Sequence, residues 1–96
     1  MRISIHKRAR QDIGDAARYY NMVRRGWGRL FIVRVRESFA SIRNFPSASR
    51  EVEQGVRVAA LKQFPFKVFY RPTADFIEVI AVVHSSRDPD TWMSRA

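Results

Sequence analysis

The chain has 96 residues, 46% of them hydrophobic, and a formal charge of +9 to which fifteen Arg contribute. It contains no Cys, which excludes disulfides, thiolate catalysis and Cys-based metal sites. No stretch is long and apolar enough for a signal peptide or a membrane span, so we expect one cytoplasmic domain over residues 1–96 with no membrane contact.

The first residues predict a strand followed by a helical hairpin. Arg2–His6 alternates, with Ile3 and Ile5 on one side, as a half-buried strand does. From Lys7 onward, apolar residues recur every three or four positions, and these are Ala9, Ile13, Ala16, Tyr20 and Val23. The polar residues between them, which are Arg10, Asp12, Asp15 and Arg18, are expected on other faces of this helix. Gly26 and Gly28 interrupt the helical pattern and predict a turn.

A second helix is predicted from about Arg29 to Asn44. Its buried stripe consists of Phe31, Val35, Phe39 and Ile42, and its other faces carry Arg29, Arg34, Arg36 and Arg43. Pro46 ends the helix because proline disfavours helical geometry in the residue before it. We expect a short loop to follow.

Three strands are predicted next, at Val56–Leu61, Phe66–Arg71 and Phe76–His84, because these segments are rich in β-branched and aromatic residues. The last two form a hairpin. Strict alternation would give the last strand one wholly apolar face, made of Ile77, Val79, Ala81 and Val83. If the helices cover the apolar face of the sheet, the opposite face would present Lys67, Arg71, Glu78 and His84, with Arg57 on the neighbouring strand.

A short helix is predicted over Asp88–Ser94, with Asp88 as its N-cap, Pro89 at its first position and Trp92 as its anchor. The predicted fold class is therefore α+β. An N-terminal strand and a helical hairpin pack on a small, mainly antiparallel sheet, and a short C-terminal helix completes the chain.

Three groups of residues resemble the RelE/ParE superfamily of bacterial toxins. Ala9, Asp12 and Ile13, followed by Tyr19 and Tyr20, resemble its first-helix pattern. Residues 56–70 resemble the ParE-type pattern of an Arg, a Leu, the sequence FPY and an aliphatic strand ending in Tyr, although FPY is FPF here. The ending His84, Arg87, Asp88, Pro89 and Trp92 resembles the closure of ParE-type plasmid-stabilisation proteins. The resemblance spans residues 9–95 and implies a toxin of a type II toxin-antitoxin system.

The resemblance also implies a partner, a ParD-like antitoxin with an acidic, amphipathic tail that orders on the toxin. The Arg excess fits such a partner, since the guanidinium group pairs bidentately with carboxylates, although it fits phosphate as well. We expect partner contacts from Arg29, Arg36, Arg57, Lys67, Arg71 and Arg87. DNA would be contacted only through the antitoxin. A bare nucleic-acid-binding module is a further alternative, but no standard signature of one is present.

Two toxic mechanisms remain open. In the ParE interpretation the protein poisons DNA gyrase by binding, without catalytic residues of its own. In the RelE interpretation it cuts messenger RNA on the ribosome, with Arg57, His84 and Arg87 as the catalytic candidates. Trp92 falls where a late acid or base would stand, and indole exchanges no proton at neutral pH. His84 could instead hydrogen-bond the turn before Arg87, and Arg87 could pair with Asp88, Asp90 or Glu78. No cofactor or metal is expected.

Overall fold

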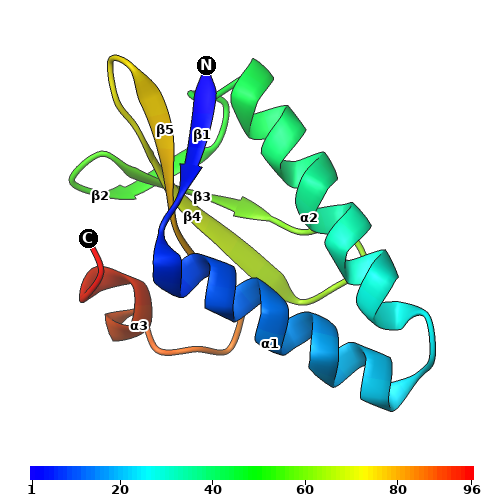
Figure 1. Ribbon diagram of the computed structural model, residues 1–96. Coiled ribbons are helices and arrows are strands. Elements are labelled where there is room, and N and C mark those ends of the chain that lie inside the picture. The colour runs from blue at the N-terminus through cyan, green and yellow to red at the C-terminus, as the bar shows by residue number, and fades with distance from the viewer.

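The computed structural model describes all 96 residues and contains three helices and five strands (Figure 1). In chain order they are β1 (Arg2–Ile5), α1 (Lys7–Val23), α2 (Trp27–Asn44), β2 (Arg50–Glu53), β3 (Val56–Ala60), β4 (Phe66–Pro72), β5 (Phe76–His84) and α3 (Asp90–Met93). The expected α+β architecture is confirmed. None of the helices combines the length and apolar character needed to cross a membrane.

The five strands form one sheet in the order β1-β5-β4-β3-β2. β1 runs parallel to β5, and the other three pairs are antiparallel. The hairpin of α1 and α2 packs on one face of the sheet, whereas α3 lies against the other face through Trp92 (Figure 1). In this strand order, β1 lies at one edge of the sheet and β2 at the other.

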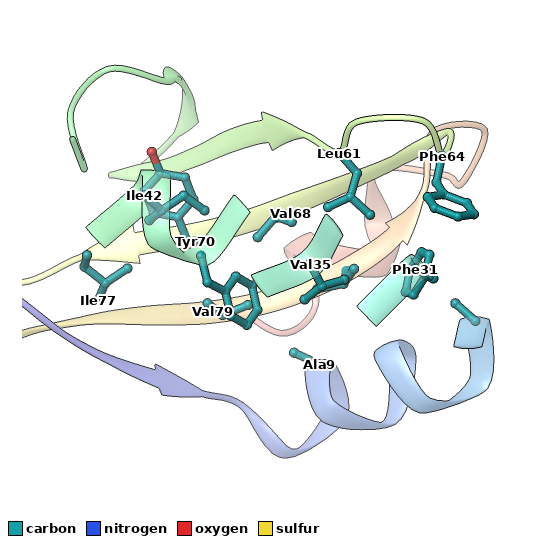
Figure 2. Close-up of a cluster of buried hydrophobic side chains, with 13 residues drawn as sticks. Ala9, Phe31, Val35, Ile42, Leu61, Phe64, Val68, Tyr70, Ile77 and Val79 are labelled. Atoms are coloured by element: carbon teal, nitrogen blue, oxygen red, sulfur yellow. The ribbon is translucent and has the colours of Figure 1, made fainter. Parts of the chain in front are cut away.

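The main core lies between the helical hairpin and the sheet and comprises 13 buried residues (Figure 2). Phe31 and Val35 of α2 meet Val68 and Tyr70 of β4 there, as the predicted apolar stripes require. Phe31 also stacks on the Tyr20 ring, with centroids 5.6 Å apart. Burying each large apolar side chain stabilises the fold by about 1.5–3 kcal/mol.

The turn between α1 and α2 uses its two glycines differently. Gly26 has a φ of 91°, a conformation that other residues rarely adopt. Gly28 lies inside α2, where an added Cβ would come within 2.5 Å of the Ala17 carbonyl oxygen. The predicted start of this helix at Arg29 is therefore wrong: α2 begins at Trp27, because Gly28 allows the two helices to touch rather than interrupting the second one.

One strand, β2, was not predicted, and α3 begins later than expected. β2 was expected to be part of a loop, because three of its four residues are charged and the segment has no apolar pattern. In the structure only Val52 of this strand is half-buried. It is joined to β3 by Gln54 and Gly55, both at positive φ. α3 begins at Asp90 with Pro89 as its N-cap, one residue later than predicted, although the Asp88 Oδ1 atom still accepts a hydrogen bond from the Asp90 N–H at 2.9 Å.

A β-bulge in β5 makes the predicted strict alternation of that strand wrong. Phe69 lies opposite Ala81 and Tyr70 lies opposite Val79, so Ile80 is an extra residue. Before the bulge, Ile77 and Val79 face the helices, but after it Ala81 and Val83 face the other side.

Candidate partner-binding surfaces

The outer face of α2 carries Arg29 and Arg36 as predicted. Both are exposed, and neither forms an ion pair within the protein. They lie seven residues apart, which places them on one face of the helix two turns from each other. Val33, between them, is 39% exposed. This face can therefore offer two unpaired guanidinium groups and some apolar surface to a partner.

The sheet face opposite the helical hairpin is less basic than predicted. Lys67 and Arg71 do lie on this side, but the Arg71 Nη1 atom is 3.6 Å from the Glu78 Oε1 atom. Most of the remaining face is apolar and belongs to a second buried cluster that includes Trp92. The Trp92 ring stacks on Phe69 at 4.9 Å with an interplanar angle of 13°. α3 thus covers part of the face that was expected to be open.

Arg57 does not share this face, so its predicted place beside Lys67 and Arg71 is wrong. It lies opposite Tyr70, whose side chain packs in the core under the helices. Its Nη1 atom donates hydrogen bonds to the carbonyl oxygens of Ser47 at 3.3 Å and Ser49 at 2.5 Å. The guanidinium group therefore holds the loop between α2 and β2, a role that sequence spacing does not reveal.

His84 was also expected on the basic sheet face, and that prediction is wrong as well. It lies opposite Phe66 on the helical side of the sheet, because the bulge at Ile80 reverses the alternation. Its Nδ1 atom accepts a hydrogen bond from the Ser86 N–H at 3.1 Å and lies 2.8 Å from the Ser86 hydroxyl. The structural alternative for His84, a bond to the turn before Arg87, is thus present.

The three residues of the nuclease interpretation do not come together. Arg57 lies at the Tyr70 level of β4, whereas His84 lies at the Phe66 level, and the two flank β4 on opposite sides. Four residues of strand span roughly 13 Å, and two inter-strand spacings add roughly 10 Å sideways, so their backbones are about 16 Å apart. Arg87 follows His84 in an exposed turn and forms none of the ion pairs considered for it.

His84 and Arg87 instead border a cleft of about 400 Å³ between α1 and the segment that follows β5. Tyr19 and Tyr20 of α1 line its other wall. Burial raises the pKa of the Tyr20 hydroxyl above its ordinary value, and the neighbouring Tyr19 adds to the effect. The Tyr20 phenol is therefore neutral at physiological pH.

An ion pair between Asp12 and Arg95 lines the same cleft. The Arg95 Nη1 atom lies 2.5 Å from the Asp12 Oδ2 atom, and the same oxygen accepts the Val82 N–H at 3.0 Å. The prediction that Asp12 lies away from the core is wrong, because Asp12 faces the sheet at the bulge. The missed signal is its spacing: Asp12 is three residues after Ala9 and four before Ala16, the two buried residues of α1.

The comparisons with known proteins agree with this architecture. A family model described as the ParE toxin of the type II toxin-antitoxin system parDE matches residues 3–89. The chain belongs to the ParE toxin family. Membership implies an antitoxin partner, since the family is defined by a two-component system. No protein among the curated ones matches the chain in sequence.

A solved structure described as the chromosomal ParDE TA system from P. aeruginosa has the same fold as this ParE toxin. The TM-score is 0.67 at 17% identity, over 88% of this chain and 95% of that chain. The family match includes Arg57, His84 and Arg87 but ends before α3, so Trp92 and Arg95 lie outside it.

Proposed function

We propose that the protein is toxic by binding and poisoning DNA gyrase, that it has no bond-breaking chemistry of its own, and that a ParD-like antitoxin neutralises it. Membership of the ParE family supports this target. The observation that carries the choice between mechanisms is the position of Arg57. Its guanidinium group donates to two carbonyls of the loop before β2, and its backbone lies about 16 Å by strand geometry from that of His84. Because this loop and β5 lie on opposite sides of β3, the two side chains do not converge on one phosphate.

Two further features weigh against the mRNA endonuclease. The Nδ1 atom of His84 is engaged by Ser86 and its ring packs against Phe66, with centroids 5.4 Å apart. Trp92, at the position of a late acid or base, is buried against Phe69, and its indole exchanges no proton at neutral pH. Only Arg87 keeps a free charged group near the cleft, and a single cation does not supply general acid-base catalysis.

For the antitoxin we propose an electrostatic approach to the outer face of α2. Arg29 and Arg36 are exposed and unpaired, whereas Arg57 and Arg71 are already held by partners within the protein. Arg87 and Lys67 are secondary candidates, one on an exposed turn and one half-buried on the open sheet face. Both proposed partners act in the cytoplasm, and DNA would be reached through the antitoxin.

A paired assay tests the mechanism. Purified protein is added to a gyrase supercoiling reaction and, separately, to ribosomes translating a defined message. We expect supercoiling to fail while the message stays intact. Message cleavage that disappears in an Arg87→Gln variant, with supercoiling unaffected, would overturn the proposal in favour of the nuclease.

A further inference from the structure

An exposed apolar face at the end of α1 continues the cleft that His84 and Arg87 border. Tyr19, Met22 and Val23 are three and four residues apart, so they are neighbours on the surface of the helix. They are 61%, 87% and 55% exposed. Three of the seven large hydrophobic side chains that the fold leaves exposed therefore stand within one turn of α1. Exposed apolar side chains that cluster in this way mark interaction sites.

Tyr19 belongs both to this exposed face and to the wall of the cleft, whose volume is about 400 Å³. Its ring meets the Tyr20 ring edge-on, with centroids 5.3 Å apart and an interplanar angle of 75°. Tyr20 in turn packs against Phe64, with centroids 4.7 Å apart, and is held by the core. The aromatic wall of the cleft is therefore fixed in place before any partner arrives.

The opposite wall of the cleft offers hydrogen-bond donors. The Nδ1 atom of His84 accepts a hydrogen bond from the Ser86 N–H, so the proton of the neutral imidazole is on Nε2. Arg87 is exposed and forms no ion pair, whereas Arg95, the other Arg of the cleft, is paired with Asp12. A donor and a free cation facing an aromatic wall suit a carboxylate that stands next to an apolar side chain.

The same surface favours a protein over a nucleic acid as its partner. The carboxylates of Asp12 and Asp15 also line the cleft, where they would repel a phosphate backbone, and Arg87 is the one Arg there without an ion pair. Beyond the cleft the exposed face is aliphatic, at Met22 and Val23, and has no ring on which bases could stack. A second copy of this chain is disfavoured, because each copy carries +9.

We propose that the cleft and the exposed face of α1 form the surface that contacts the target protein. An apolar side chain of the target enters the cleft beside Tyr19, and a neighbouring carboxylate pairs with Arg87. Tyr and Arg are among the residues that most often dominate the binding energy of protein interfaces. The inference rests on the proposed function in naming gyrase as that target. The surface belongs to α1 and to the segment between β5 and α3, which runs beside α1 in Figure 1, whereas the proposed antitoxin approach uses α2.

Site-specific crosslinking tests the surface directly. Met22 is replaced by the photo-reactive amino acid p-benzoylphenylalanine, which the 87% exposed position accommodates. The full-length protein is illuminated in a supercoiling reaction with gyrase and plasmid DNA, and separately in its complex with the antitoxin. We expect a crosslink to a gyrase subunit. The same amino acid at Phe45, which is 67% exposed just after α2, is the matched control and should give no crosslink to gyrase.

A substitution measures the contribution of the aromatic wall. Tyr19→Ser should raise the toxin concentration that half-inhibits supercoiling by at least about tenfold, as truncation of a central aromatic side chain does at other interfaces. Its affinity for the antitoxin, measured by calorimetry, should stay unchanged. Phe45→Ser removes a ring of similar exposure from the end of α2 and should inhibit gyrase like the wild type.

The outcomes separate the inference from the proposed function. Wild-type inhibition that Tyr19→Ser retains in full would overturn the inference and leave gyrase as the target. So would a Met22 position that crosslinks to DNA, to the antitoxin alone, to a second copy of the toxin or to nothing while supercoiling is inhibited. Failure of the wild type to inhibit gyrase would overturn both. The crosslinking protein keeps Tyr19, so it decides even if Tyr19→Ser fails to fold.

Discussion

Asp12 and Arg95, one in the first helix and the other next to the last residue, form an ion pair that ties the C-terminal segment to α1. Their side chains are only 16% and 7% exposed. The Asp12 carboxylate also accepts a hydrogen bond from the Val82 N–H, and the Arg95 Nη1 atom donates to the Ile80 carbonyl at 3.4 Å. The two side chains of the pair therefore bind backbone groups at and just after the β5 bulge. The pair therefore fixes the bulge, and the bulge decides which face His84 occupies.

An Asp12→Ala substitution should destabilise the protein by roughly 3 kcal/mol or more, because it leaves Arg95 buried without a counter-charge and the Val82 N–H without an acceptor. Combining it with Arg95→Met should cost less than Asp12→Ala alone, since no unpaired charge remains. Urea denaturation measures both. Asp15→Ala is the control: its ion pair with Arg18 is exposed, and it should change stability by less than about 1 kcal/mol. Equal losses at the two positions would contradict the buried role of Asp12.

Gly28→Ala should destabilise the helical hairpin by about 1–3 kcal/mol, because the new methyl group would collide with the Ala17 carbonyl and force the helices apart. Gly14→Ala is the matched substitution in α1. There the nearest atom is the flexible Arg18 guanidinium at 3.4 Å, and removing a helical glycine should stabilise by about 0.5–1 kcal/mol. Thermal unfolding of the two variants should therefore shift in opposite directions, and shifts of the same sign would rule out close contact of the helices at Gly28.

The stability of the protein should fall at alkaline pH partly through Tyr20. Its folded-state pKa is raised above the ordinary value of 10.0, so the unfolded chain ionises first. The contribution is fully present below pH 10.0 and is lost as the pH rises through the folded-state pKa. Tyr20→Phe should therefore gain stability relative to the wild type above that pH and show no such gain at neutral pH. Denaturation at both pH values tests this, and a constant difference between the two proteins would contradict it.

Association with the antitoxin should weaken as salt concentration rises, and the Arg29→Gln and Arg36→Gln double variant should flatten that dependence. Loss of two unpaired charges on one helix face should slow association by roughly tenfold at low salt, with a smaller effect on dissociation. Arg18→Gln is the control, because Arg18 is exposed but already paired with Asp15. Stopped-flow binding measures the rates. An unchanged salt slope in the double variant would remove α2 from the electrostatic approach.

The order of elements and most of the core could be predicted from sequence, because helical and strand periodicity report which residues are buried. Phe31 and Ile42 were placed correctly for that reason. β2 could not be found, since an edge strand of mostly charged residues has no apolar pattern. The side of the sheet that His84 occupies could not be found either, because it depends on the bulge at Ile80, which follows from the contact of Asp12 and Arg95 across the fold.

In the candidate site, too, features set by local periodicity could be predicted and features set by contacts across the fold could not. Exposure of Arg29 and Arg36 follows from the helical period and was predicted correctly. The role of Arg57 depends on where the chain goes after Pro46, and no local pattern predicts that path. From sequence, an Arg on a strand such as Arg57 suggested a cation that binds a partner or substrate. Its hydrogen bonds to the Ser47 and Ser49 carbonyls show instead that it positions a loop.

The mechanism is tested most directly by titrating the purified protein into a gyrase supercoiling reaction and adding the antitoxin afterwards. We expect supercoiling to stop, gyrase-cleaved DNA to accumulate, and the antitoxin to restore the reaction. Undiminished supercoiling at toxin concentrations that lead to cleavage of ribosome-bound message would contradict it.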